Sequence, residues 1–151
     1  EVRKNGKPIK TYQSETIESS ICGSSTLRDI QACLHDVVWD NHLGTASVNP
    51  WGMRKAQSNL VHIAGKTGTA QLFENGRYRS RRHRMSFVGY FPEEDPQYTC
   101  ICVISGPKYY GYYDAGMDCG TVVRQIAEKT MVYAAEYVIE DGQKVLKIKN
   151  E

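Results

Sequence analysis

The sequence has no long apolar run, no large charge imbalance and no metal-binding cysteine spacing, and each absence removes a class of protein. No apolar run approaches the roughly 20 residues that a helix needs to span a bilayer. The formal net charge of +2 gives no general argument for a nucleic-acid partner, and none is expected. The cysteines include no C-x-x-C pair and no cysteine–histidine spacing for zinc, so no zinc site is expected.

The five cysteines are an odd number, so at least one thiol is free or pairs between chains. They are Cys22, Cys33, Cys100, Cys102 and Cys119. Cys100 and Cys102 alternate along "YTCICVIS", where a bridge between them would be strained. We therefore expect buried free thiols that act as small apolar side chains. Free thiols in this number fit poorly with an oxidising compartment.

The size and composition favour one globular domain. The 151 residues are 40% hydrophobic and 24% charged, which is enough for a core without disulfide or metal staples. No signal-peptide pattern opens the chain, and "EVRKNGKPIK" already has the character of a strand. We expect that the sequence is a piece of a longer protein.

Local patterns predict a hairpin, a helix, three strands, a second helix and a last hairpin. Asn5-Gly6 is a strong hairpin signal inside Glu1–Gln13. Apolar residues recur at helical spacing in "LRDIQACLHDVVWD", with a Ser or Thr cap expected at Ser24-Ser25-Thr26. The other predicted segments are a polar connection at Asn41–Asn59, strands at Leu60–Ala64, Met85–Phe91 and Tyr98–Ser105, a turn at Gly76-Arg77, a loop at Gly106–Gly120, a helix at Thr121–Ala135 and a hairpin that turns at Asp141-Gly142.

The order of these segments predicts the fold class. Short turns between consecutive strands indicate antiparallel neighbours. Tyr98–Ser105 is apolar on both faces, which is typical of a central strand. We expect an α+β fold, an antiparallel sheet with packed helices, and not a parallel nucleotide-binding sheet.

The segment "HIAGKTGTAQ" carries two competing signals, a phosphate-binding Gly-Lys-Thr and a Lys-Thr-Gly motif. A phosphate-binding loop needs a glycine where this chain has Leu60, and it needs a long helix after the lysine. Neither condition holds. Lys-Thr-Gly is instead typical of an edge strand in penicillin-recognising serine enzymes. A lysine and alternating threonines on one strand can bind a carboxylate, because residues two apart point the same way.

The surrounding sequence resembles the C-terminal part of class B penicillin-binding proteins, the D,D-transpeptidases that cross-link peptidoglycan. "AGKTGTAQ" is followed by "NGRY", "SFVGYFPEEDPQYTCICVIS", "KYYG" and the helix "VVRQIAEKTM", and is preceded by a "GTA" turn. The likeness covers Leu27–Ala135, and "GRY" and "KYYG" lean towards the septum-forming type. It implies that residues 1–151 are the C-terminal portion of a transpeptidase domain with the fold of penicillin-binding proteins and serine β-lactamases.

The resemblance also implies roles for four residues. Lys66 would set the electrostatic field of the cleft, and Thr67 and Thr69 would bind the substrate or drug carboxylate through their hydroxyls. The backbone N–H of Thr69 would form half of an oxyanion hole, and Gly68 would keep the strand open for substrate. Lys66 and Thr69 are thus the expected catalytic residues, and Thr67, Gly68 and Thr69 the expected substrate-binding residues.

Two further motifs of the family are missing or doubtful. Only Ser105, in Ser105-Gly106-Pro107-Lys108, has a lysine three residues on, and Pro107 does not suit the helix that the nucleophilic serine opens. Ser47-Val48-Asn49 matches S-x-N in letters alone. We expect this chain to lack the nucleophile and to be inactive by itself.

The resemblance further implies partners and a location for the parent protein, and it implies no metal or organic cofactor. The partners would be the D-Ala–D-Ala end of a peptidoglycan stem peptide, β-lactam antibiotics and other cell-wall synthesis proteins. The parent would be anchored in the inner membrane, with this domain outside the cytoplasm. Rival interpretations are a non-catalytic binding or scaffold domain of the same fold and a serine β-lactamase relative. A chain with part of its sheet missing would also self-associate.

Two further clusters have no assigned role. Arg77, Arg79, Arg81, Arg82 and Arg84 gather with His83 and indicate a solvated hairpin tip or a surface for an anionic partner. Tyr109, Tyr110, Tyr112 and Tyr113 favour either carbohydrate stacking or a loop beside the cleft.

Overall fold

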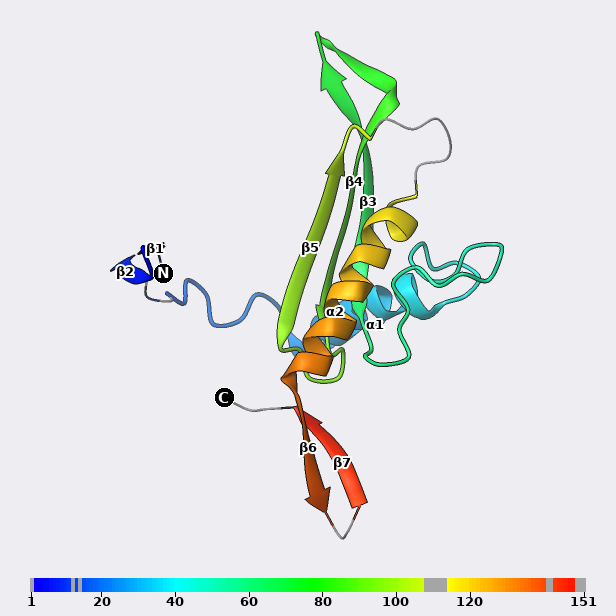
Figure 1. The fold of residues 1–151 in the computed structure, drawn as a ribbon. Helices are drawn as coiled ribbons and strands as arrows, with labels where there is room; N and C mark the ends of the chain where they lie inside the picture. The colour runs from blue at the N-terminus through cyan, green and yellow to red at the C-terminus, as the bar shows by residue number, and fades with distance from the viewer. Residues whose placement is uncertain (1, 12, 14, 108–113, 141–142, 149–151) are drawn as a thin grey trace.

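The computed structural model describes residues 2–11, 13, 15–107, 114–140 and 143–148. Figure 1 shows α2 lying along one three-stranded sheet, with α1 behind it. In chain order the elements are β1 (Val2–Lys4), β2 (Lys7–Lys10), α1 (Ser24–Trp39), β3 (Ala64–Glu74), β4 (Arg77–Phe91), β5 (Tyr98–Ser105), η1 (Gly116–Gly120), α2 (Thr121–Ala134), β6 (Ala135–Glu140) and β7 (Gln143–Ile148). The predicted α+β class, an antiparallel sheet with packed helices, is confirmed.

The central sheet has the order β3-β4-β5, and both pairs are antiparallel. Lys66 stands opposite Val88 and Thr67 opposite Phe87, so neighbouring residues of β3 face opposite sides of the sheet. One side carries Met85, Phe87 and Phe91, which are almost completely buried. Val123 and Ala127 of α2 belong to the same buried cluster, so α2 closes this side of the sheet.

Strand β3 differs from the prediction at its start. The expected strand at Leu60–Ala64 is wrong, because β3 begins only at Ala64 and runs through Lys-Thr-Gly to Glu74. Ile63 is nonetheless fully buried, so the apolar character of this segment reflects core packing and not sheet pairing. The turn that follows is at Asn75-Gly76, one residue before the predicted position, where both residues have positive φ, 52° and 75°. Asparagine and glycine tolerate this conformation best.

Strand β4 begins at Arg77 and not at Met85, so the arginine-rich segment belongs to the strand. Its pairing with β3 continues from Glu74↔Arg77 to Ala64↔Tyr90, with an irregularity between Gln71 and Leu72. β5 pairs only with residues 84–91, so the β3–β4 hairpin extends past the end of β5. Figure 1 shows this tip standing beyond the rest of the sheet.

The prediction that Tyr98–Ser105 is a central strand is wrong for this chain. Within the described residues β5 pairs with β4 alone and forms an edge of the sheet. Its apolar side chains divide between the two faces: Cys100 and Cys102 pack against the core, while Ile101 and Val103 are 65% and 50% exposed. One apolar face of the strand therefore has no cover in this structure.

Helix α1 is confirmed, but the expected side-chain cap is absent and part of its apolar face is exposed. The N-cap residue is Gly23, and no side chain caps the helix, so the predicted Ser or Thr cap is wrong. Val38 is the one fully buried residue of the helix, whereas Leu27 and Ile30 are 45% and 48% exposed. Only the C-terminal end of the predicted stripe packs on the core.

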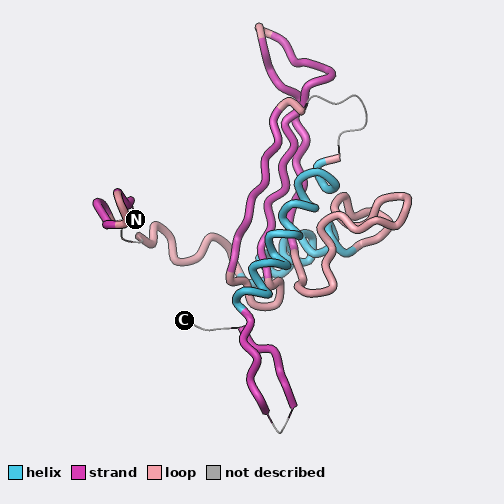
Figure 2. The backbone as a smooth tube through the Cα atoms, viewed as in Figure 1, coloured by secondary structure: helices cyan, strands magenta, loops and turns pink. Residues whose placement is uncertain are grey.

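Both predicted hairpins are present and stand apart from the sheet, as Figure 2 shows. Asn5 and Gly6 turn the first with φ of 52° and 75°. The second joins β6 and β7, and its predicted turn at 141–142 lies outside the described residues. The predicted loop at Gly106–Gly120 is partly wrong, because its end forms the short π-helix η1. Its four tyrosines fall within 108–113 and also lie outside the described residues.

Candidate functional site

The predicted site residues lie in the first half of β3, which is an edge strand among the described residues. Thr67 and Thr69 share one side of the strand, and both line a cavity of about 240 Å³. We call this cavity the threonine pocket; its lining residues are Thr45, Lys55, Thr67, Thr69, Asp114, Ala115 and Gly116. The structure thus brings together the two hydroxyls that were expected to bind a carboxylate.

Lys66 does not join the threonine pocket, contrary to the expectation that the lysine and the threonines point the same way. It alternates with Thr67 along β3 and is exposed. Its ammonium Nζ donates a hydrogen bond to the backbone carbonyl of Thr67, at 2.8 Å. The positive charge therefore lies over the strand beside the pocket and not inside it.

Gly65 and Gly68 allow β3 to approach β4 closely. A Cβ atom at Gly65 would lie 2.4 Å from the carbonyl oxygen of Val88 and 2.7 Å from a ring carbon of Phe87. A Cβ atom at Gly68 would lie 2.6 Å from the hydroxyl of Ser86, which can rotate away. Gly65 is therefore required by backbone packing. Gly68 has no side chain, so nothing projects from β3 at this position on the side of the strand opposite the pocket.

The hydroxyl of Thr67 is held from the neighbouring segment. Its Oγ1 lies 2.7 Å from Oγ1 of Thr45, which belongs to the "GTA" turn after α1. The turn is fixed in part by the backbone N–H of Ala46, which donates to the carbonyl of Val37 in α1. The end of α1 therefore positions the residue that holds Thr67.

Two residues that line the threonine pocket, Lys55 and Asp114, were not predicted from the sequence. Lys55 comes from the segment that was expected to be a polar connection, yet only 10% of its side chain is exposed. Its Nζ lies 2.8 Å from Oδ2 of Asp114 and 3.1 Å from the carbonyl oxygen of Thr45. No local pattern pairs these residues, because Asp114 comes from beyond β5.

Ser47 and Asn49, the S-x-N match, form hydrogen bonds with the backbone of their own loop. The hydroxyl of Ser47 donates to the carbonyl of Gly44 at 2.9 Å. Oδ1 of Asn49 accepts from the backbone N–H groups of Trp51 and Met53, at 3.0 and 2.8 Å. These bonds satisfy buried polar groups of the turn, which agrees with the interpretation of this match as a coincidence. Lys108, the lysine of the Ser105 match, lies outside the described residues.

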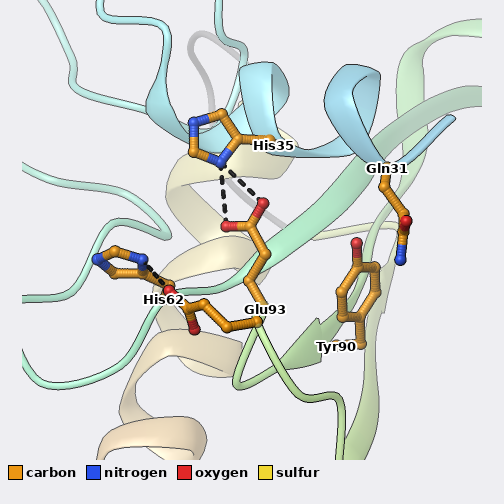
Figure 3. Close-up of a pocket in the computed structure, with 6 residues that line it drawn as sticks. Gln31, His35, His62, Tyr90 and Glu93 are labelled. Atoms are coloured by element: carbon orange, nitrogen blue, oxygen red, sulfur yellow. Dashed lines mark hydrogen bonds and ion pairs between the residues drawn. The ribbon is translucent and has the colours of Figure 1, made fainter. Parts of the chain in front are cut away.

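A second cavity, of about 390 Å³, lies between α1 and the turn after β4. Figure 3 shows its lining residues, which are Gln31, His35, His62, Tyr90, Glu93 and Glu94. Nδ1 of His35 lies 2.8 and 3.0 Å from the two carboxylate oxygens of Glu93, and His62 pairs with Glu94. Burial, followed by the charge of Glu93, raises the pKa of Tyr90.

These contacts fasten α1 to the sheet. The ring of Trp39 stacks on His35 and packs against His62, with centroid distances of 6.1 and 4.7 Å. Its indole N–H donates to the carbonyl of Ile63 at 3.0 Å, just before β3 begins. Because both carboxylates already have imidazole partners, we interpret this cavity as structural.

The arginine-rich hairpin tip is partly neutralised within itself. Glu74 pairs with Arg79 and Arg82 at 3.5 and 2.9 Å. The guanidinium of Arg84 donates to the hydroxyl of Ser105 at 2.9 Å. These partners fit the interpretation of a solvated hairpin tip better than that of a free anion-binding cluster.

All five cysteines are free, but the expectation that they are buried holds only for Cys119. Cys119 is fully buried, whereas Cys33 is exposed on α1. Burial, together with the neighbouring Cys102, raises the pKa of the Cys119 thiol to about 12. Burial also raises the pKa of Cys100. These two thiols therefore act as small apolar groups, not as nucleophiles.

The described part of the chain offers neither a metal-binding cluster nor a membrane-spanning helix. They contain no group of three or more His, Cys, Asp or Glu side chains that could hold a metal ion. They also include no helix with the length and apolarity needed to cross a membrane.

Comparisons with known proteins point to one family. The family model described as penicillin binding protein transpeptidase domain matches residues 4–128. A probable peptidoglycan D,D-transpeptidase, PenA, of Neisseria gonorrhoeae is 36% identical over 102 residues, which are 68% of this chain and 16% of that protein. Stage V sporulation protein D of Bacillus subtilis is 30% identical over 96 residues, 64% of this chain and 13% of that protein.

A solved structure shows the same fold. Penicillin binding protein 2X of Streptococcus thermophilus matches 72% of this chain with a TM-score of 0.59 and 24% sequence identity. The matched region is 16% of that chain. This sequence therefore spans only a small part of the length of the relatives it resembles.

The thiols provide a test of the core packing. At about pH 8 the Cys119 thiol stays protonated because its pKa is raised, and only the thiolate reacts with disulfide reagents. We expect a Cys33→Ser variant to lose the fastest-reacting thiol and a Cys119→Ser variant to keep it. Reaction with Ellman's reagent in native and denaturing buffer measures this. A Cys119 that reacts as fast as Cys33 in native buffer would contradict the buried position.

Proposed function

The chain belongs to the penicillin-binding-protein transpeptidase family, and on this premise we propose that the longer protein containing it is a peptidoglycan D,D-transpeptidase. The observation that carries the proposal is the convergence of the Thr67 and Thr69 hydroxyls on one pocket beside an edge strand. A stem peptide can lie along such an edge, with its terminal carboxylate at the two hydroxyls.

Each residue of the motif has a role in this proposal. Thr67 and Thr69 donate hydrogen bonds to the carboxylate of D-Ala–D-Ala or of a β-lactam. Lys66 provides a positive field beside the carboxylate, and Gly68 leaves room for the substrate backbone. The backbone N–H of Thr69 stabilises the oxyanion that forms on the scissile carbonyl.

The reaction is acyl transfer through a serine that this chain does not supply. The serine oxygen bonds to the carbonyl carbon of the D-Ala–D-Ala amide, and its proton passes to the departing D-Ala amine. An amine of a neighbouring stem peptide then attacks the ester and releases the serine. A β-lactam acylates the same serine as its ring C–N bond breaks, and the resulting ester is released slowly, so it stalls the enzyme.

The proposal includes a location and partners for the parent protein. We place this domain outside the cytoplasm, on a protein anchored in the inner membrane that works with other cell-wall synthesis proteins. The rival is a domain of the same fold that binds but does not catalyse, and it is distinguished by the absence of a nucleophile.

Exposure to a penicillin tests the proposal. We expect an acyl adduct by intact mass on the longer protein and none on this chain alone. A Thr69→Val change in the longer protein should lower the acylation rate about 10- to 100-fold, the effect of one hydrogen bond to a charged group. Thr99→Val, on exposed β5, is the matched control and should leave the rate unchanged.

The other outcomes are equally informative. No adduct on either form would favour the non-catalytic rival. An adduct on this chain alone would show that it has its own nucleophile, with Ser105 the first candidate. Equal losses for the Thr69 and Thr99 variants would remove the carboxylate role of Thr69.

We also propose that this chain, taken by itself, self-associates through β5. This edge strand exposes unpaired backbone groups together with Ile101 and Val103. Light scattering should show oligomers that an Ile101→Lys variant disperses, because a charge on an edge strand opposes pairing. Ile9→Lys, at an exposed position of the β1–β2 hairpin, is the control. A monodisperse monomer at high concentration would refute the proposal.

A further inference from the structure

A line of polar contacts runs beneath β3 from Asp114 to Thr67. The carboxylate of Asp114 holds the ammonium of Lys55 at 2.8 Å, and the same ammonium donates to the carbonyl of Thr45 at 3.1 Å. The hydroxyl of Thr45 then lies 2.7 Å from the hydroxyl of Thr67. Three segments that are distant in the sequence meet in this line, and its last member is a residue of the proposed site.

Thr45 is held at its backbone from two sides. Lys55 binds its carbonyl oxygen, and η1 packs directly against the same atom, since a Cβ at Gly116 would lie 2.2 Å from it. The backbone N–H of Lys55 also donates to the carbonyl of Ser47, which fixes the two arms of the loop together. A residue fixed in this way presents its hydroxyl to Thr67 in one place.

The Lys55–Asp114 pair adds little net charge to the pocket. Its two side chains are 10% and 21% exposed, and their opposite charges sum to zero. A buried ion pair also gives little stability over an apolar pair of similar size. The hydrogen bond from Lys55 to the carbonyl of Thr45 points instead to a geometric role.

We propose that Lys55 and Asp114 are positioning residues that orient the Thr67 hydroxyl towards the carboxylate of the ligand. The inference rests on the proposed function. A hydroxyl donates one hydrogen bond and accepts others. The inference requires that Thr45 donates the hydrogen bond between the two hydroxyls, so that Thr67 keeps its own proton for the carboxylate. A donor that also accepts a hydrogen bond is polarised, which strengthens the bond that it makes.

The test compares variants that separate geometry from charge, in the longer protein that carries the whole transpeptidase domain. Lys55→Met leaves Asp114 as an uncompensated negative charge, which would repel a carboxylate. Lys55→Met combined with Asp114→Asn removes the pair and the charge together. Lys55→Arg keeps a donor for both partners, and Arg54→Met is the matched control, since its exposed side chain lies outside the pocket lining.

Each variant is acylated with a penicillin and with the analogue whose carboxylate is replaced by a carboxamide. We expect the double variant to lose about tenfold in acylation rate with the carboxylate ligand, the effect of one hydrogen bond, and little with the carboxamide. Lys55→Arg should recover most of the rate. Equal losses with both ligands would indicate a purely structural role and overturn the inference, as would a double variant with the wild-type rate.

A second measurement, also on the longer protein, does not depend on catalysis. The backbone amide signals of Thr45, Thr67 and Thr69 in nuclear magnetic resonance spectra should shift in the double variant, while Arg54→Met should leave them in place. Unchanged signals would overturn the coupling between Lys55 and Thr67. If the wild-type longer protein reacts with neither ligand, the proposed function fails, and these signals alone decide whether Lys55 positions Thr67.

Discussion

The antiparallel pairing of β3 with β4 determines on which side of the sheet each residue of the Lys-Thr-Gly motif lies. Its close approach at Gly65 leaves no room for a side chain, and its register sets Thr67 against Phe87. Because side chains alternate along a strand, this register sends Thr67 and Thr69 to the side that carries the core and sends Lys66 to the other. The core packing of β4 therefore also fixes the side of β3 on which the proposed carboxylate site lies.

The threonine pocket depends on segments that meet only in the folded chain. The loop after α1 provides Thr45 and Lys55, and the stretch before η1 provides Asp114. α1 is itself tied to the sheet by Trp39 and by the histidine–glutamate pairs of the second cavity. A disturbance at the end of α1 would thus reach the proposed site through the turn that contains Thr45.

The sequence predicted the elements better than their boundaries or partners. Helical spacing identified α1 and α2, and the Asn5-Gly6 pair marked the turn of the first hairpin, because these signals are local. The start of β4 was missed because an arginine-rich run does not resemble a strand, although residues 77–79 and 83–84 pair with β3. β5 was expected to be central because it is apolar on both faces, whereas here one face is exposed. Lys55 and Asp114 were missed because a contact between distant segments leaves no periodic pattern.

The most direct test of the central claim is a crystal structure of the longer protein after reaction with a penicillin. We expect the ligand carboxylate at about 2.6–3.2 Å from the hydroxyl oxygens of both Thr67 and Thr69, with the Lys55–Asp114 pair still formed beneath them. A carboxylate bound away from both threonines would contradict the proposed role of the threonine pocket, whatever the acylation rate.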